Sequence, residues 1–306
     1  MSFIREKTRG SSAYYELVKS VREEGRVRQR VIKYFGDRES MLDYCRSHGV
    51  PVPRPRSGSI LGVPLCASLK GKLDTLNSLR PLPKNAVESL RRKFDVEMTY
   101  NSNAIEGNRL TLRETYFVLE KGITIGGKPM KDYLEATNHR DAIRLLEKIA
   151  DSKAKITETD VLNLHATILD RIDPHNAGFY RHEQVYITGT RHVPPNWRDV
   201  PEKMKMVISE LNSSGRCCAA VESAARLHHG LAWIHPFVDG NGRLARLLAN
   251  LRLMRAGFPP VVLQRRIRRS YYSSLDRADS GDLKPLTLLI AHDVDRALDL
   301  WLSAAK

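Results

Sequence analysis

Twelve consecutive residues, 235–246, contain the side chains that phosphate chemistry requires. His235 has a pKa range suited to accepting a proton from an attacking hydroxyl. Asp239 offers a hard carboxylate oxygen, which suits Mg²⁺ bound together with the oxygens of a phosphate. A Gly-Asn-Gly turn at 240–242 leads directly into a predicted helix. Free backbone N–H groups and the positive end of that helix favour an anion at this place.

The glycines and arginines of the same segment predict a site for more than one phosphate. Gly240 and Gly242 flank Asn241 and let a phosphate approach the backbone closely. Arg243 and Arg246 lie one turn apart on the predicted helix, so both can reach forward to phosphate oxygens. Single histidines, glycine turns and helical arginines usually serve structure alone. Their combination at this spacing is what indicates a catalytic site.

The run from His235 to Arg246 resembles the signature of Fic-domain proteins, H-P-F-x-D/E-G-N-G-R-x-x-R, and every fixed position matches. The similarity extends over about residues 85–300. The resemblance implies a mainly α-helical Fic-fold bundle. It also implies an enzyme that transfers AMP from ATP to a Ser, Thr or Tyr hydroxyl of a target protein, with self-modification as one form of that activity.

The resemblance assigns a role to each residue of the motif. His235 would be the general base that deprotonates the target hydroxyl, and Asp239 would hold Mg²⁺ against the phosphates of ATP. Residues 240–242 would cradle these phosphates. Arg243 would clamp them, and Arg246 would hold the γ-phosphate. Mg²⁺ is therefore the expected cofactor and ATP the expected substrate.

Two other segments resemble parts of the family that bind the target and the nucleoside. Residues 184–195 predict a short β-hairpin, the flap, which would align the target backbone by strand addition. Tyr272 and Asp279 stand where some members contact the nucleoside. Asp279 replaces an Asn of the family pattern, so the resemblance leaves the adenine contact and the choice of nucleotide open. The flap candidates are Val185, Ile187, Thr190 and His192.

The segment Ser-Asn-Ala-Ile-Glu-Gly-Asn at 102–108 resembles the inhibitory motif S/T-x-x-x-E-G/N of one class of the family. Ser102 and Glu106 are the inhibitory candidates. Glu106 can pair with Arg246 and so occupy the charge that a γ-phosphate needs. This predicts an autoinhibited adenylyltransferase. In some members this glutamate positions a water that removes AMP, so an AMP-removing enzyme that depends on Glu106 is an alternative.

Helical periodicity predicts the elements that must position these residues, and residues 57–306 are mainly α-helical. The helix before the inhibitory glutamate opens at a capping Asn85 and ends at Glu106. The predicted helices are 85–106, 113–121, 132–150, 157–169, 201–211, 219–234, 242–256, 270–279 and 286–303.

Residues 1–56 form a separate basic appendage, with 13 basic minus 7 acidic residues giving +6. Residues 13–21 and 26–35 are rich in aromatic and β-branched types and predict a two-stranded hairpin. An isolated hairpin is marginally stable, so we expect it to pack against another element. The proline-rich stretch 51–58 predicts a linker. A third hypothesis follows, in which this hairpin binds nucleic acid and the phosphate site only senses a nucleotide.

The composition bounds these hypotheses. The chain has 306 residues, 42% of them hydrophobic, and 50 basic minus 35 acidic residues give +15. The expected location is cytoplasmic, because no apolar run approaches the roughly 20 residues of a membrane span and residues 1–10 lack the apolar core of a secretory signal. The family is often homodimeric, and the sequence leaves the oligomeric state and the target protein open. Four cysteines match neither a disulfide framework nor a zinc site, which predicts reduced thiols: Cys45, Cys66, Cys217 and Cys218.

Overall fold

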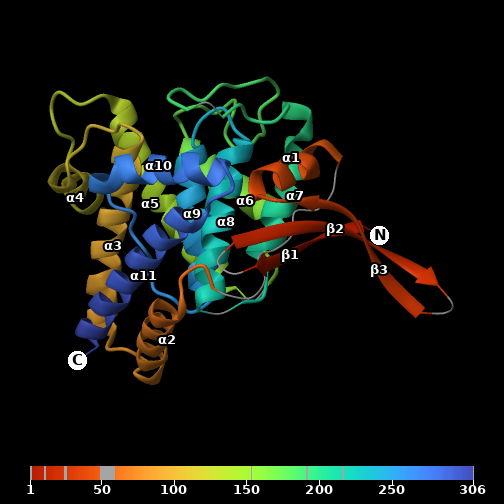
Figure 1. Cartoon of the computed structure of the whole chain (residues 1–306). Helices are drawn as coiled ribbons and strands as arrows, with labels where there is room; N and C mark the ends of the chain where they lie inside the picture. Colours follow the sequence, from red (N-terminus) through yellow and green to blue (C-terminus); the bar gives the residue numbers. More distant parts are fainter. Residues whose placement is uncertain are drawn as a thin grey trace. The chain divides into compact units, whose positions relative to one another are not determined.

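The chain folds into two compact units, residues 1–58 and 59–306 (Figure 1). The predicted linker at 51–58 lies outside the described residues. The computed structural model describes residues 2–9, 12–23, 26–48, 59–152, 154–190, 192–215 and 217–305.

The first unit is a three-stranded antiparallel sheet with one helix. Its strands are β1 (Ser2–Arg9), β2 (Ser12–Glu23) and β3 (Arg26–Phe35), in the order β1-β2-β3, and α1 (Arg38–His48) follows. The predicted two-stranded hairpin is therefore incomplete, because β1 and α1 were not expected. A hairpin leaves its apolar face uncovered, and these two elements complete a small core of Ile4, Tyr15, Leu17, Phe35, Met41 and Cys45.

The second unit is mainly α-helical, as the periodicity predicts. Within the described part of the chain, no helix is both long and apolar enough to cross a membrane. The helices are α2 (Val63–Ser78), α3 (Lys84–Ile105), α4 (Leu112–Lys121), α5 (Met130–Asp151), α6 (Glu158–Leu169), α7 (Val200–Leu211), α8 (Cys218–Ile234), α9 (Asn241–Arg255), α10 (Arg268–Asp279) and α11 (Lys284–Ala304), with 3₁₀ turns η1 (Trp197–Asp199) and η2 (Arg265–Ile267).

Helix α9 lies at the centre of this unit, packed against α5 and α8 (Figure 1). It is buried nearly all round, including three of its arginines. Buried guanidinium groups need partners. Arg252, for example, donates to Ser223 Oγ at 3.1 Å and to the Gly215 carbonyl at 2.7 Å. The other two, Arg243 and Arg246, belong to the motif, so the interior of the bundle fixes where they point.

The start and end of α3 differ slightly from the prediction. Asn85 is the second residue of the helix and does not cap it. Pro83 occupies the cap position, and no side chain caps the helix there. Glu106 is the residue after the last helical one, and Gly107 follows with a φ of 102°. A left-handed glycine at this place ends the helix and turns the chain away. The carboxylate of Glu106 therefore stands at the helix tip.

The hairpin predicted at 184–195 is wrong: residues 184–190 and 192–195 form no strand. Pro194 and Pro195 lack the N–H groups that a strand ladder requires. Side chains hold the two arms instead. Gln184 Nε2 donates to the Pro194 carbonyl at 2.9 Å, and Arg181 donates to the carbonyls of Glu183 and Pro195 at 2.8 and 2.6 Å.

The prediction of four reduced thiols is also wrong, because Cys66 and Cys218 form a disulfide. Cys66 lies on α2 and Cys218 opens α8, and their Cα atoms are 5.7 Å apart. The packing of α2 against α8 joins two cysteines that are 152 residues apart in sequence, so spacing could not reveal the pair. Cys45 and Cys217 are free.

Candidate active site

A loop of six residues, 235–240, joins α8 to α9 and carries the predicted general base, His235, and the predicted Mg²⁺ ligand, Asp239. Asn241 secures this loop: its Oδ1 accepts from the Phe237 N–H at 3.0 Å, and its Nδ2 donates to the Phe237 carbonyl at 2.8 Å. His235 has a φ of 49°, in the left-handed region that non-glycine residues seldom adopt. Gly240 has a φ of 81°. The loop thus turns sharply at His235 and at Gly240, and the hydrogen bonds of the Asn241 side chain hold this turn in place.

His165 on α6 holds the loop at 235–240 through a hydrogen bond and ring stacking, and it was not anticipated from the sequence. Its Nδ1 accepts from the Gly178 N–H at 3.0 Å, so its Nε2 carries the proton and donates to the Asp239 carbonyl at 2.9 Å. The ring stacks on Phe237 with centroids 3.6 Å apart. Burial lowers the pKa of His165 to about 4, so the imidazole is neutral. The sequence did contain a signal for this residue, because His165 lies among the apolar residues of the helix predicted at 157–169.

His235 is half-buried and has one nitrogen free for catalysis. Its Nδ1 lies 3.4 Å from the Ala232 carbonyl, which can only accept, so Nδ1 carries the proton and Nε2 is left as an acceptor. Burial lowers the pKa of His235 below its ordinary value, and the positive charge of Arg181 lowers it further. A neutral imidazole with an open nitrogen is the form that a general base needs.

Asp239 presents one carboxylate oxygen to solvent. Its Oδ1 accepts from the Gly240 N–H at 2.6 Å and from Arg243 at 3.1 Å. Burial alone would raise its pKa, but the charge of Arg243 and the Gly240 hydrogen bond outweigh this and hold the pKa below the usual range. Oδ2 lies 3.8 Å from the exposed Lys131 ammonium. The half-exposed carboxylate suits Mg²⁺ bound by one protein ligand and substrate oxygens. No cluster of three metal-ligating residues occurs in the described residues.

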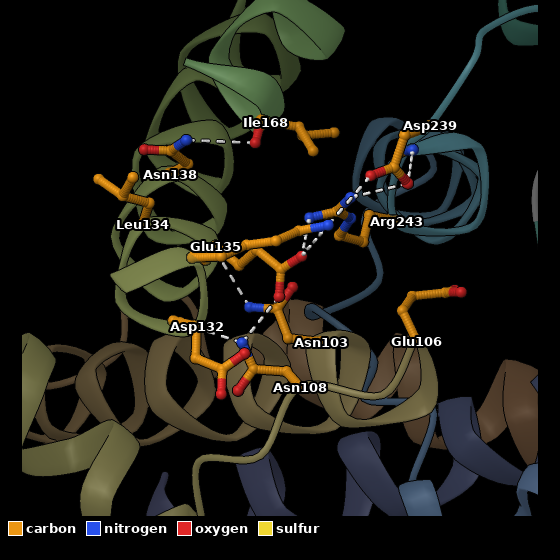
Figure 2. A network of polar contacts seen from close by, with 12 residues as sticks. Asn103, Glu106, Asn108, Asp132, Leu134, Glu135, Asn138, Ile168, Asp239 and Arg243 are labelled. Carbon is orange, nitrogen blue, oxygen red and sulfur yellow. Dashed lines mark hydrogen bonds and ion pairs between the residues drawn. The ribbon is translucent and has the colours of Figure 1, made fainter. Parts of the chain in front are cut away.

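Arg243 is turned away from the loop surface and into the bundle (Figure 2). Its side chain is 2% exposed and lies 3.3 Å from Glu135 on α5 and 3.1 Å from Asp239. In this arrangement it orients Asp239. A direct clamp on phosphate, the role that the resemblance gives to Arg243, would require these ion pairs to rearrange.

Arg246 is the arginine that pairs with Glu106. Its Nη2 lies 2.7 Å from Glu106 Oε1 and also donates to the Ser102 carbonyl at 2.9 Å. Its Nε donates to Ser102 Oγ at 2.9 Å. The guanidinium is 6% exposed, whereas the Glu106 side chain is 33% exposed. Both residues of the second sequence motif therefore contact this one buried arginine.

Glu106 also lies against the first turn of α9. This helix begins at Asn241 with no side-chain cap and no acid in its first turn. A Cβ at Gly242 would overlap Glu106 Oε1, so only glycine leaves room for the carboxylate. A negative charge is stabilised at a helix N-terminus. The carboxylate of Glu106 thus fills part of the place that the motif offers to a phosphate.

Two asparagines on either side of Glu106 fasten its turn to α5 (Figure 2). Asn103 Nδ2 donates to the Glu135 carbonyl at 3.1 Å. Asn108 Nδ2 donates to the Asp132 carbonyl at 3.0 Å and to Glu135 Oε2 at 2.8 Å. Because Glu135 also pairs with Arg243, one carboxylate connects the Glu106 turn to the motif helix. Neither asparagine was identified from the sequence, although both lie inside the 102–108 motif.

A cavity of about 450 Å³ opens beside these residues and gathers most of the predicted site. Ser102, Val185, Asp239, Gly240, Arg243 and Arg246 lie outside its lining. The predicted residues that line it are Glu106, Ile187, Thr190, His192, His235, Asn241, Gly242, Tyr272 and Asp279.

Residues 187–190 and 192 form one wall of this cavity, and two of them, Thr190 and His192, are held by hydrogen bonds. His192 Nε2 donates to the Trp233 carbonyl at 2.7 Å, and the Thr190 hydroxyl lies 3.4 Å from Asp276 on α10. Arg181, another residue that sequence reasoning missed, joins the arms of the segment to the motif, because its Nε donates to the His235 carbonyl at 2.8 Å. The buried Arg181 thus couples the position of this wall to that of His235.

Helix α10 forms a second wall, which meets the first where Thr190 lies close to Asp276. Tyr272 is 37% exposed, and the Arg268 guanidinium lies over its ring, 5.1 Å from the centroid. Asp279, two turns later, accepts a hydrogen bond from His229 on α8 at 2.8 Å. The two residues predicted to contact a nucleoside therefore do lie in the same cavity as His235.

Comparison with known proteins agrees with the motif. The Fic/DOC family matches residues 155–253. "Protein adenylyltransferase Fic" of Drosophila virilis is 37% identical over 240 residues, which are 78% of this chain and 49% of that protein. The chain thus spans about half the length of the curated relatives it matches. The amino-terminal domain of IS1634 family transposases matches residues 4–48.

Solved structures share the helical fold. Fic-1 (residues 134–508) from C. elegans superposes with a TM-score of 0.71 at 33% identity, covering 78% of this chain and 71% of the other. A Fic domain-containing signalling protein from Bacteroides thetaiotaomicron gives a TM-score of 0.71 at 30% identity, covering 78% of this chain and 96% of the other. The matches in sequence and in fold agree with the loop geometry, and the chain belongs to the Fic/DOC family.

Proposed function

We propose that the protein is an adenylyltransferase that transfers AMP from ATP to a hydroxyl of a target protein, and that Glu106 restrains it. The observation that carries the proposal is that a histidine with a free Nε2, the uncapped N-terminus of α9 and Glu106 meet in one cavity of about 450 Å³. Relatives that cover most of the chain are named protein adenylyltransferase Fic, which supports the reaction class.

The chemical step uses His235 as the base. The target hydroxyl oxygen forms a bond to the α-phosphorus of ATP, and its proton passes to His235 Nε2. The bond from that phosphorus to the bridging oxygen breaks, and pyrophosphate leaves. Backbone N–H groups at the start of α9 stabilise the phosphates. Mg²⁺, when bound at Asp239, would neutralise phosphate charge. The wall formed by residues 187–190 and 192 would align the target backbone beside His235.

Glu106 would restrain this step by taking the charge of Arg246. A γ-phosphate held by Arg246 needs the guanidinium nitrogen that Glu106 contacts at 2.7 Å. The two anions cannot occupy one place, so ATP binds with its phosphates displaced and the α-phosphorus poorly aligned with the target hydroxyl. Release of Glu106 would permit productive binding.

Transfer of radiolabel from ATP tests this proposal. We expect label from the α-phosphate, and none from the γ-phosphate, on the protein itself or on lysate proteins. Glu106→Gly should raise the labelling, and His235→Ala should abolish it. Glu120→Gly, an acid-to-glycine change on an exposed site of α4, is the matched control and should leave labelling at the wild-type level. Labelling from the γ-phosphate, or labelling that survives His235→Ala, would overturn the proposal.

Removal of AMP is a second candidate, because Glu106 and His235 line the same cavity. The Glu106 carboxylate could hold a water that attacks the phosphorus of an AMP-modified target, releasing AMP and the free hydroxyl. Modified protein, prepared with Glu106→Gly, is the substrate for the test. Wild type should release AMP from it and Glu106→Gly should not. Equal release by both would rule out this reaction.

Nucleic-acid binding by the first unit is a candidate favoured by the match of residues 4–48 to a transposase domain. On the edge strand β3, Arg30, Lys33 and Tyr34 are exposed, a combination that suits phosphates and bases. Retention of the full chain on DNA should fall with salt and should weaken in an Arg30→Ala/Lys33→Ala variant. Retention that is insensitive to both would exclude this role.

A further inference from the structure

A second, smaller cavity of about 30 Å³ lies beside Arg246 in the interior of the helical unit. Every residue that lines it is buried except Leu263, which is half-buried. Three of the lining residues, His139, His228 and Asp293, are at most 3% exposed. Each has one side-chain atom without a hydrogen-bond partner among the described residues, namely His139 Nε2, His228 Nδ1 and Asp293 Oδ2. Buried polar atoms normally have partners, so three such atoms around one cavity indicate a bound ligand.

The position of the proton on His228 follows from its neighbour Tyr271. Arg246 Nη1 donates to the Tyr271 hydroxyl at 3.5 Å, and that hydroxyl lies 3.1 Å from His228 Nε2. Burial raises the pKa of Tyr271, so the hydroxyl keeps its proton and needs an acceptor. Arg246 can only donate, so Tyr271 donates to His228 Nε2. Burial lowers the pKa of His228 to about 3, and the neutral ring therefore carries its one proton on Nδ1.

Asp293 on α11 supplies the complementary group. Its Oδ1 pairs with Arg296, and its Oδ2 is a buried acceptor. The cavity is thus lined by an N–H donor of His228 and a carboxylate of Asp293. The N–H and the charge of Arg246 would repel a cation, and the carboxylate would repel an anion. A water molecule both accepts and donates, and a polar cavity of about 30 Å³ has room for one.

All the donors in the resulting chain point the same way. Arg246 donates to Tyr271, and Tyr271 donates to His228. His228 would donate to the water, and the water would donate to Asp293. A chain that runs without reversal from a cation to an anion is cooperative, because each hydrogen bond polarises the next. Asp293 is thus a distant counter-charge for Arg246, and it remains in place when Glu106 is released.

Building on the proposed function, we propose that this cavity is a site for one water molecule, and that the water makes His228 and Asp293 positioning residues for Arg246. They would hold the guanidinium in place for the terminal phosphate of ATP once Glu106 has left it. ADP has no γ-phosphate, so its affinity should not depend on them.

The water site is tested by NMR of the ¹⁵N-labelled full chain, without any nucleotide. We expect His228 to carry its proton on Nδ1 at neutral pH, and we expect this proton to show a cross-relaxation peak with a bound water. His228→Phe identifies the signal by its loss. A proton on Nε2, or an Nδ1 proton without a water peak, would overturn the site.

Calorimetric titration with ATP and with ADP tests the positioning role, in a full chain that carries Glu106→Gly and His235→Ala and cannot turn over. In Asp293→Asn the amide oxygen stays with Arg296, which only donates, so the amide NH₂ group faces the cavity and interrupts the chain of donors. The affinity for ATP should fall about tenfold, and that for ADP should not change. Asp295→Asn removes the same charge from the same helix, outside the cavity, and should leave both affinities unchanged.

His228→Phe keeps an aromatic ring but removes both nitrogens, so it should show the same selective loss for ATP. A variant that only damaged the fold would weaken ATP and ADP together. Equal losses for both nucleotides, no loss in either variant, or a loss in Asp295→Asn as large as in Asp293→Asn would overturn the positioning role.

Failure of the proposed function would give a different result. If the chain with Glu106→Gly and His235→Ala binds neither nucleotide, or binds ATP no more tightly than ADP, the contact of Arg246 with the γ-phosphate fails. The positioning role then fails with it, while the NMR experiment still decides the water site.

Discussion

At the residue scale, the chemistry depends on the protonation of His235. Its Nδ1 is held by the Ala232 carbonyl, so only Nε2 can accept a proton. Burial and the charge of Arg181 both favour the neutral ring, and the charge of Glu106 opposes them. The base is therefore ready at a lower pH than an ordinary histidine would be.

The pH dependence of transfer tests this protonation state. The neutral form is the active base, so kcat/KM should fall as the pH drops through the pKa of His235 in the free enzyme. Because that pKa lies below 6.5, the midpoint of the acid limb should lie below pH 6.5. In Glu106→Gly the midpoint should move lower still, since a nearby negative charge is lost. A midpoint at or above pH 6.5 would contradict this reading of the site.

The sequence predicted the residue types of the site but not the directions of the side chains. Arg243 and Arg246 are the same residue type one turn apart, and the motif alone treats both as phosphate ligands. The structure separates them, because Glu135 on α5 draws Arg243 into the bundle and Ser102 on α3 holds Arg246 beside Glu106. These partners come from distant segments, so local spacing cannot reveal them.

At the element scale, the tip of α3 is what presents Glu106. The turn at 106–108 is held to α5 by Asn103 and Asn108. Helical periodicity located α3 to within one residue at its end. It could not show these cross-helix hydrogen bonds, nor the loss of the hairpin at 184–195, where side chains and prolines replace a strand ladder.

Loosening this turn should release the restraint in part. Asn108→Ala removes two hydrogen bonds to α5, so Glu106 spends less time on Arg246 and labelling from the α-phosphate of ATP should rise. The rise should be smaller than in Glu106→Gly, because the carboxylate remains. Asn101→Ala serves as a control, because it removes one hydrogen bond within α3 and one from the Arg265 N–H but leaves the bonds from the turn to α5 intact, and it should not raise labelling. Labelling in Asn108→Ala at the wild-type level would show that the turn does not hold Glu106.

At the scale of the whole molecule, the second unit buries three neutral histidines. Burial lowers the pKa of His139 and His228 to about 3 and that of His165 to about 4. Burial also raises the pKa of Asp95 to about 6, which acts in the opposite direction. The folded state thus disfavours protonation of three histidines and favours protonation of one carboxylate, Asp95.

Acid should therefore destabilise the second unit well above the range where most carboxylates titrate. Between pH 6.5 and 4 the unfolded chain binds protons that the three folded histidines do not, so the free energy of unfolding falls as the pH falls. Each histidine lowers the free energy of unfolding by about 1.4 kcal/mol for each unit by which the pH falls. Below pH 6, protonation of Asp95 in the folded state offsets the effect of one histidine. Urea unfolding at pH 7, 6 and 5 measures this slope. His139→Leu should make it shallower, and a constant stability from pH 7 to 5 would refute the account.

The central claim is that the Glu106 carboxylate and the terminal phosphate of ATP compete for one place beside Arg246. Titration calorimetry with ATP and ADP, in a His235→Ala background that prevents turnover, tests it most directly. Glu106→Gly should raise the affinity for ATP by about tenfold while changing that for ADP much less. Equal gains for both nucleotides, or no gain for ATP, would contradict the claim.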